Sequence, residues 1–546
     1  MESLYDRALT EIGSEGKFQR NFDIVYNVLF PILWAVAYNN IVLALVVIPH
    51  TCKIPEKPEN MSKYDWTSKY IPTVKSVTGL QKHSNCLIYT NRKKNETKAC
   101  DFVYDNTWYE STVPSDNDWV CDKEIYVAEI RSYTKVGEIL GSLFFGWFGD
   151  VYGRKLTYVF SVLLLVIGRF LCVLSSSSFA LIAIGCIIAS LPSWFAPQSV
   201  TIISCEISSP KRRSTVAKLR LLSTSLGLFL TPFFYWGLRN WKSFMIITTV
   251  PQLLFLLFSW KLIESPQWLM LNRKSKHALR NLKLIAKANK NTICLDTETE
   301  ILTTRPEEIS KKTDVLGPFA LFSGWQIALN TILQLLIWFA VSANYGVSLY
   351  SSGEKTDGNP FLDFAWQALA EIPGYFVGAW LADHIGRRYT GMASFTLTTI
   401  IWVLYGYREI STAAWMKNEW LSTTLAVINR TSMTVAYYII DLLNIELYPT
   451  CLRQSGMSLG NVVSGGGGAF ASYIVVWVGS KHFTILIIIT IFCGFVSTFF
   501  LPETLNAKLP ETLEDARKFG TLGYKRCTTE NTENIQLHET FESSLL

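Results

Sequence analysis

The chain contains the stretch Asp150-Val151-Tyr152-Gly153-Arg154-Lys155 directly after a long apolar run. A second version, Asp383-His384-Ile385-Gly386-Arg387-Arg388, follows another apolar run 233 positions later (383 minus 150). Both copies place an acid, a glycine and two basic residues in the same order. A repeat at this distance indicates that the chain is built from two similar halves.

Two further pairs of short motifs repeat in the same order and at nearly the same distance. Glu206 and Arg213 match Glu446 and Arg453 at an offset of 240, and Glu264-Ser265-Pro266 matches Pro502-Glu503-Thr504 at an offset of 239. Three pairs in register predict a six-plus-six duplication. Parallel repeats about an axis along the membrane normal are typical of secondary transporters, which rock around a central site.

The composition places these halves in a membrane. Of the 546 residues, 49% are hydrophobic, 14% are aromatic and only 17% are charged, whereas about 25% charged residues is typical of soluble chains. The charges are gathered between long uncharged runs, which excludes a soluble enzyme. The net charge of +6 is small and no basic stripe with interleaved aromatics occurs, so we expect no nucleic-acid partner.

A membrane-spanning helix needs about 20 mostly apolar residues, and twelve stretches meet this requirement. They are residues 24–48, 127–148, 156–174, 179–204, 215–236, 242–262, 322–344, 361–382, 389–407, 420–443, 454–478 and 482–501. The weakest are 127–148, 361–382 and 420–443, because each contains ionisable residues. Such residues usually face a bundle interior or a water-filled path, so these three spans also point to function.

Short loops rich in Lys and Arg predict the orientation. Between Leu271 and Lys290 there are seven Lys or Arg residues and no Asp or Glu, and such loops stay in the cytoplasm. Twelve spans then place both termini in the cytoplasm. The predicted divisions are a cytoplasmic N-terminus 1–23, a six-helix half 24–262, a cytoplasmic linker 263–318, a second six-helix half 319–501 and a cytoplasmic tail 502–546.

The segment 49–125 is then a large extracellular loop, and its own residues agree with that placement. It contains four cysteines, an even number suited to two disulfides in an oxidising compartment: Cys52, Cys86, Cys100 and Cys121. Three connectivities are possible, and spacing does not choose among them. The loop also carries glycosylation sequons at Asn60 and Asn95.

Four motifs resemble those of a known family. The run Gly141 to Asp150, continuing to Arg154-Lys155, is similar to the loop signature of the major facilitator superfamily. Three other runs resemble motifs of its organic cation/anion (carnitine) transporter family: Glu264-Ser265-Pro266-Gln267-Trp268-Leu269, Glu446-Leu447-Tyr448-Pro449-Thr450 and Leu501-Pro502-Glu503-Thr504. An outer loop with four cysteines and sequons is also a feature of that family.

The resemblance implies an all-α major facilitator fold with two pseudo-symmetric six-helix halves and twelve membrane helices. It implies a polyspecific secondary transporter in the plasma membrane that moves small organic cations or zwitterions, such as quaternary amines and carnitine-like compounds, by alternating access. The alternatives are an organic anion transporter of the same family and a non-transporting receptor that uses the outer loop. The lipid bilayer and a small organic ion are the expected partners, and the sequence leaves the oligomeric state open.

We expect no catalytic site, cofactor or metal. No phosphate-binding GxxxxGK[ST] run occurs, and the Gly465–Gly468 run is not one. The six histidines show no metal-ligand spacing, and no Ser, Cys or acid pair reads as a catalytic group. A static receptor would also have no need for the repeated motifs.

The resemblance implies that the repeated charged residues form a conformational latch. Carboxylates and guanidiniums at the inner helix ends can pair between the halves when the cytoplasmic side is closed, and rocking then breaks these pairs. The predicted latch residues are Asp150, Arg154, Glu206, Arg213, Asp383, Arg387, Glu446 and Arg453. The alternative is that they only cap helices and obey the topology rule.

Ionisable residues inside spans are the strongest candidates for contact with substrate. Glu371 lies mid-span before Pro373 and Gly374, and the resemblance implies that an acid here attracts the cation. The alternative is a structural pair between Glu371 and Arg430, and Arg430 is itself a candidate for binding anionic groups. Asp441 could face substrate or belong to the latch.

Aromatic rings form the other half of cation recognition, because a ring face attracts an ammonium group by about 0.5–2 kcal/mol. Trp338 and Tyr345 are seven residues apart, on one face of the seventh span, and Trp194 lies in the fourth. All three match pocket positions of organic cation transporters. In the family that the sequence resembles, the eleventh span often carries an acid in cation transporters or an arginine in anion transporters. The matching position here falls near Gly465, which carries no charge, and this favours including zwitterions among the substrates.

Overall fold

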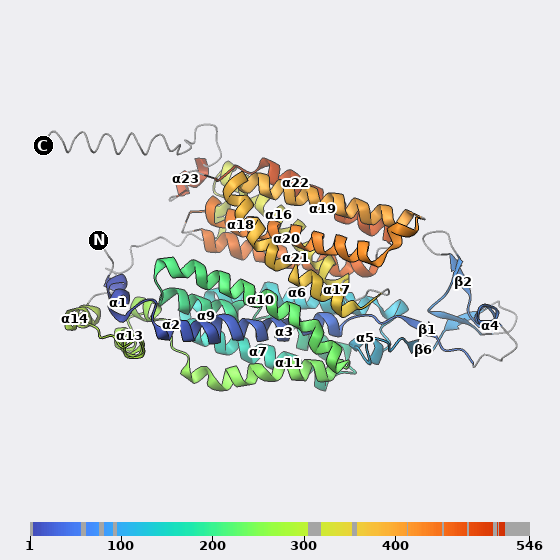
Figure 1. The fold of residues 1–546 in the computed structure, drawn as a ribbon, viewed down its shortest axis with the longest axis horizontal. Coiled ribbons are helices and arrows are strands. Elements are labelled where there is room, and N and C mark those ends of the chain that lie inside the picture. The colour runs from blue at the N-terminus through green and yellow to red at the C-terminus, as the bar shows by residue number, and fades with distance from the viewer. Residues whose placement is uncertain are drawn as a thin grey trace.

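The computed structural model describes residues 4–55, 62–75, 81–90, 96–303, 318–351, 358–411, 413–449, 452–477, 480–505, 510 and 513–518. In this part the chain is mostly helical, with six short strands. Figure 1 shows two helical bundles lying lengthwise against each other, one from the first half of the chain (blue to green) and one from the second (yellow to red).

The first bundle contains the first six predicted spans. Its helices are α2 (Lys17–Asp23), the π-helical turn η1 (Ile24–Leu29) and α3 (Phe30–Ala44), which run on as one, then α6 (Ile125–Tyr152), α7 (Arg154–Leu174), α8 (Phe179–Ser190), α9 (Phe195–Glu206), α10 (Pro210–Leu238), α11 (Trp241–Leu257) and η3 (Phe258–Lys261). The fourth span is divided into α8 and α9 by a turn at residues 191–194. Pro192 has no N–H to continue the helix, and Ser193 has a positive φ of 43°.

The second bundle contains the last six predicted spans. Its helices are α16 (Trp325–Ser351), α17 (Pro360–Leu369), α18 (Glu371–Ile385), α19 (Arg387–Ile410), α20 (Glu419–Leu447), α21 (Arg453–Trp477) and α22 (Ser480–Phe500), with short 3-10 turns η4 (Pro318–Phe322) and η5 (Ala414–Lys417). The eighth span is divided at Ala370, immediately before Glu371. Ala370 itself keeps helical dihedral angles, with a φ of −63° and a ψ of −19°, and its N–H donates to the carbonyl of Trp366 at 3.1 Å, so the interruption is slight.

Six helices in the described ranges are long and apolar enough, judged by length and composition, to cross a membrane. They are Lys17–Ala44, Arg154–Leu174, Phe179–Glu206, Thr215–Leu238, Trp241–Lys261 and Trp325–Ser351, with Thr484–Phe500 as a shorter apolar helix. The other predicted spans are helical as well. Three of them, in α6, α17–α18 and α20, are the spans that are weakest in the sequence.

A small disulfide domain, residues 50–121, lies at one end of the bundles (Figure 1). Three antiparallel strand pairs form it: β1 (His50–Cys52) with β6 (Phe102–Tyr104), β2 (Thr73–Lys75) with β3 (Gln81–His83), and β4 (Leu87–Tyr89) with β5 (Thr97–Ala99). Helices α4 (Lys63–Tyr70) and α5 (Val113–Asp116) and the turn η2 (Cys121–Lys123) complete it.

Two disulfides hold this domain together and use all four cysteines of the predicted outer loop. Cys52 bonds Cys100, and Cys86 bonds Cys121, which is one of the three connectivities that the sequence left open. A domain with so small a hydrophobic core benefits from such cross-links. The two sequon asparagines, Asn60 and Asn95, lie outside the described residues.

The opposite end of the molecule carries a layer of short helices (Figure 1). They are α1 (Leu4–Ile12), α12 (Pro266–Leu271), α13 (Ser275–Asn289) and α14 (Leu295–Thr303), with α23 (Leu513–Lys518) beside the second bundle. The hydroxyl of Tyr5 donates to the carbonyl of Glu206 at 2.7 Å, and Arg7 pairs with Glu300 at 3.1 Å. The start of the chain and the first part of the linker therefore pack together on the first bundle.

Candidate functional site

The repeated motifs form matching corners at the bundle ends far from the disulfide domain. In the first corner Gly153 joins α6 to α7 with a φ of 105°, a conformation that favours glycine. The carboxylate of Glu264 accepts the backbone N–H of Arg154 at 3.0 Å and that of Lys155 at 3.1 Å. Burial raises the pKa of Glu264, and the backbone N–H groups that it accepts oppose this increase.

The second corner repeats this arrangement. Gly386 joins α18 to α19 with a φ of 107°, and the carboxylate of Glu503 accepts the N–H groups of Arg387 at 2.9 Å and Arg388 at 3.1 Å. An acid at a helix N-terminus satisfies free N–H groups and offsets the positive end of the helix dipole. Glu264 and Glu503 are thus helix caps at corresponding positions, which the predicted latch set did not include.

Four of the latch residues form ion pairs within their own half. Arg154 lies 3.9 Å from Glu206. Arg387 donates from Nε and Nη2 to Glu446, with the shortest separation 3.0 Å. In this conformer the charged residues therefore stabilise each corner separately. Pairing between the halves stays a prediction for the conformer in which these ends meet.

The other latch residues are more exposed or lie outside the description. Asp383 is 68% exposed and 3.6 Å from Arg387. Arg213 is exposed and donates to a backbone carbonyl of α9 at 3.1 Å. The side chains of Asp150 and Arg453 lie outside the described part of the structure.

Glu371 and Arg430 form a buried ion pair in the second half. Nη2 of Arg430 lies 2.7 Å and Nε 2.9 Å from one carboxylate oxygen of Glu371. The hydroxyl of Tyr345 donates to the same oxygen at 2.9 Å. Ser225, from α10 of the first half, donates to the other oxygen at 3.4 Å. Glu371 is thus a carboxylate that groups from both halves contact.

The predicted aromatic residues of α16 lie beside this pair. Trp338 and Tyr345 both contact the ring of Tyr437 edge-on, with centroids 6.0 Å and 5.5 Å away, so the predicted shared face is confirmed. The guanidinium of Arg430 lies 3.6 Å from the centroid of Tyr345. A protein cation thus occupies the ring face and the carboxylate together, which is the chemistry that an organic ammonium would use.

Trp194 lies on the opposite side, in the first half. Its ring centroid is 5.1 Å from that of Tyr38, and the Tyr38 hydroxyl donates to Glu138 at 2.9 Å. Lys135 pairs with Glu138 at 2.8 Å, as their spacing of three residues on one helix predicts. The structure therefore places Trp194 against Tyr38 of α3, whose hydroxyl reaches Glu138 of α6, and does not bring it against Trp338 and Tyr345.

Asp441 is exposed on the inner part of α20, where it has a charge interaction with Arg220 of α10 in the other half. A cavity of about 210 Å³ lies beside Arg220, between α9, α10 and α12, and its lining includes Glu206 and Arg213. The cavity lining does not include Glu371. All of its lining residues belong to the first half, at the end of the bundle where the latch residues lie.

The halves are closed against each other near the disulfide domain. Phe361, at the start of α17, is fully buried although its ring partners all come from the first half. They are Tyr109 of the disulfide domain and Tyr235 and Trp236 of α10, with centroids 4.9, 5.9 and 6.1 Å away. Phe361 therefore inserts into an aromatic socket formed by these three residues.

Hydrogen bonds hold the socket rigidly on the first half. Arg239, at the end of α10, donates to the carbonyls of Thr107 at 2.8 Å and Trp108 at 3.3 Å. The hydroxyl of Tyr235 donates to the carbonyl of Ser111 at 2.8 Å. Opening this end of the molecule must withdraw Phe361 from the socket.

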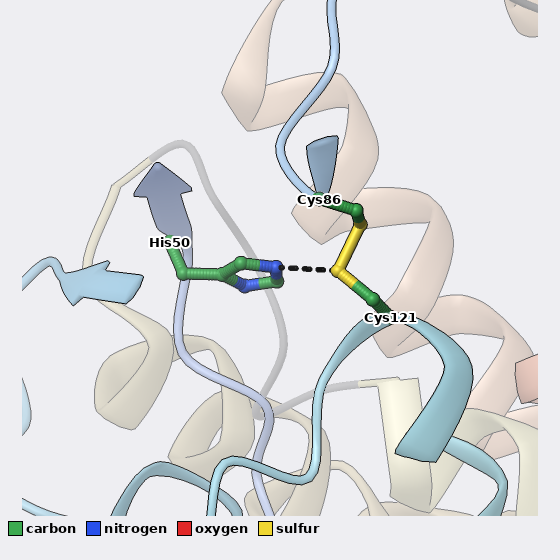
Figure 2. A group of neighbouring side chains, drawn as sticks. All are labelled: His50, Cys86 and Cys121. Atoms are coloured by element: carbon green, nitrogen blue, oxygen red, sulfur yellow. Dashed lines mark hydrogen bonds between the residues drawn. A yellow bond between two sulfur atoms is a disulfide. The ribbon is translucent and has the colours of Figure 1, made fainter. Parts of the chain in front are cut away.

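His50, Cys86 and Cys121 lie together in the disulfide domain, in a geometry that resembles a three-ligand metal cluster. Figure 2 shows that the two sulfurs are bonded to each other, with a ring nitrogen of His50 3.7 Å from the Cys121 sulfur. Disulfide sulfurs are not thiolates and do not act as the ligands that zinc prefers. Burial lowers the pKa of His50, and the cluster is structural.

The fold and these sites define a class of protein. Two six-helix halves with corresponding corners, a divided helix and charged residues between the halves describe a membrane transporter with a rocking mechanism. Residues 77–515 match the family model "Sugar (and other) transporter", and the chain belongs to this family.

Individual relatives support a narrower placement. The chain is 27% identical to the organic cation transporter protein of Drosophila melanogaster over 94% of this chain and 95% of that protein. It is also 27% identical to solute carrier family 22 member 1 of Bos taurus over 94% and 92% of the two chains. The predicted placement among organic cation transporters of the major facilitator superfamily is confirmed, and the chain is a transporter and not an enzyme.

A solved structure confirms the fold. The xylose transporter XylE from E. coli, in an inward open conformation, aligns with a TM-score of 0.56 over 89% of this chain and 98% of that one, at 12% identity. The predicted all-α fold of twelve membrane helices in two halves is therefore confirmed.

Several residues of the site were not predicted from the sequence. Tyr437 is one of them, although it follows Arg430 by seven residues, the same spacing that joins Trp338 to Tyr345. Applying that spacing to the tenth span would have identified it. Tyr38 and Phe361 carry no comparable signal, because apolar and aromatic residues are common throughout the spans.

Proposed function

We propose that this protein moves small organic cations or zwitterions across the plasma membrane by alternating access, with both termini in the cytoplasm. The relatives reported above carry the name of organic cation transporters, which supports the substrate class. The predicted divisions, with halves 24–262 and 319–501 around a cytoplasmic linker 263–318, accompany this proposal. In this orientation the closed, disulfide-bearing end faces outward and the end with the latch residues opens to the cytoplasm.

The observation that carries the proposal is the setting of Glu371. It is a buried carboxylate, 5% exposed, inside a membrane helix. It touches Tyr345 of its own half and Ser225 of the other. A carboxylate next to a ring face recognises an ammonium group, and contacts from both halves let its surroundings change when the halves rock.

Arg430 gives this site a specific mechanism. It is the cation that now occupies both Glu371 and the face of Tyr345. An ammonium substrate would compete with Arg430 for these groups and be released when the pair forms again. The anion alternative is not favoured by the relatives, which carry the name of organic cation transporters. Trp338 and Trp194 would line the path on either side, and Asp441 would lie on its cytoplasmic part.

The test is uptake of a labelled quaternary amine and a labelled carboxylate by cells that express the protein. We expect the wild type to take up the amine, and Glu371→Gln to lower this uptake at least tenfold at equal surface abundance. Asp363→Asn is the matched control, because Asp363 is also a buried acid of the divided helix but bonds Thr423 and Gln367. Absence of amine uptake by the wild type would refute the proposal.

A further inference from the structure

The glycines of α21 make room for a lysine of the other half. A side chain at Gly465 would meet Ile139 of α6. One at Gly468 would lie 2.9 Å from Cε and 3.1 Å from Cδ of Lys135. The aliphatic part of Lys135 therefore crosses α21 where a larger residue would collide with it. The eleventh span carries no charge here, and the facing helix supplies a positive one.

Lys135 faces the interior between the halves. The side chain of Lys135 is 23% exposed and that of Glu138 is 19% exposed, so both remain partly accessible. Lys135 also lies near Tyr437 of the second half. Tyr437 in turn contacts Tyr345, which donates to Glu371. Tyr437 and Tyr345 thus connect Lys135 to the pair of Glu371 and Arg430.

The carboxylates along this path are each already matched by a base. Glu138 pairs with Lys135 at 2.8 Å and Glu371 with Arg430 at 2.7 Å. Asp441 has its charge interaction with Arg220. A substrate with a single positive charge can engage an acid only by leaving a protein cation without its partner, which is costly in a buried setting. A zwitterionic substrate adds one charge of each sign, so the numbers of positive and negative charges in the site stay equal.

We propose that Lys135 is a specificity-determining residue that binds the carboxylate of a dipolar substrate, whose ammonium group binds at Glu371 and the ring of Tyr345. This inference rests on the proposed function and selects zwitterions over simple cations within it. The ammonium of Lys135 has three N–H donors. It contacts both oxygens of Glu138, at 2.8 and 3.0 Å, and one donor remains for the substrate.

The experiment compares two probes that differ only in the carboxylate: 3-(trimethylammonio)propanoate and the corresponding amide. We expect the wild type to take up the carboxylate form at least ten times faster at low concentration. Lys135→Gln should abolish this preference through a rise in KM for the carboxylate form, with uptake of the amide kept or increased. Lys135→Arg should restore the preference. Lys242→Gln is the matched control, since Lys242 lies near Asp116 at the outer end.

A second variant tests the same site without removing the lysine. Gly468→Ala adds a methyl group whose nearest neighbours are all atoms of the Lys135 side chain. It should also reduce the preference for the carboxylate form of the probe. An unchanged preference in both variants, or a wild type that prefers the amide, would overturn the role of Lys135 and leave amine transport standing. If the wild type takes up neither probe nor any quaternary amine, the proposed function itself fails.

Discussion

Replacing Phe361 with alanine should shift the protein toward the state that is open at the disulfide end. Phe361 inserts into the socket of Tyr109, Tyr235 and Trp236, and all three residues belong to the other half or to the domain fixed on it. These contacts exist only while this end is closed. The substitution therefore removes stabilisation from one state of the rocking equilibrium.

The size of the shift follows from the three ring contacts. An aromatic pair contributes about 0.5–1.5 kcal/mol beyond its burial, so three pairs contribute about 3 kcal/mol. This corresponds to about a 100-fold change in the equilibrium constant between the closed and open states. We leave out the burial term, because the Phe361 ring would also find partial cover in the open state.

The assay uses a cysteine in place of Ser132, whose hydroxyl donates to the carbonyl of Ala469 across the halves and which is 7% exposed. A membrane-impermeant maleimide applied to intact cells should label this cysteine up to about 100-fold faster when Phe361→Ala is also present. Phe30→Ala is the control, because Phe30 is equally buried but all its ring partners lie in the first half. Equal labelling with and without Phe361→Ala would refute the gate.

Two other predictions concern the disulfide domain and the corners. Replacing both Cys86 and Cys121 with serine opens a loop of 35 residues and should destabilise the domain by about 4 kcal/mol. Faster trypsin cleavage within residues 50–121 would show this, Cys294→Ser is the control, and unchanged cleavage would contradict it. Arg387→Ala removes the pair with Glu446 and should lower turnover about tenfold with KM unchanged, equivalent to about 1.4 kcal/mol. Arg388→Ala, whose guanidinium packs on Phe499 instead, should change turnover little, and a loss of turnover as large as that of Arg387→Ala would count against the role of the pair.

The sequence predicted the architecture because its signals are local. A run of apolar residues long enough to cross a bilayer is usually helical wherever it lies, so each of the twelve stretches is helical over most of its described residues. The corners were also predictable, since Gly153 and Gly386 need a positive φ and acids tend to cap helices. Two of the predicted spans, the fourth and the eighth, are each assigned as two helices. For the fourth span, Pro192 is the sequence feature that indicates the interruption.

The partners of the charged residues depend on long-range packing and on the conformational state, which no local pattern encodes. Arg387 forms an ion pair with Glu446 within its own half in this conformer. The sequence around Arg387 would be equally compatible with a partner in the other half. The socket around Phe361 brings together the disulfide domain, α10 and α17. Nothing in the spacing of Tyr109 and Phe361 indicates that they meet. The disulfide connectivity was open for the same reason.

The attachment of the disulfide domain to the α10–α11 corner has a practical consequence. Arg239 and Tyr235 fasten the domain to the first half, so the domain must travel with that half as it turns. A fluorophore on this domain and a second one near Trp415, which is exposed in the turn η5 just before α20 in the other half, would report the rotation as a change in energy transfer. Single molecules could then be watched through the transport cycle with no label inside the membrane.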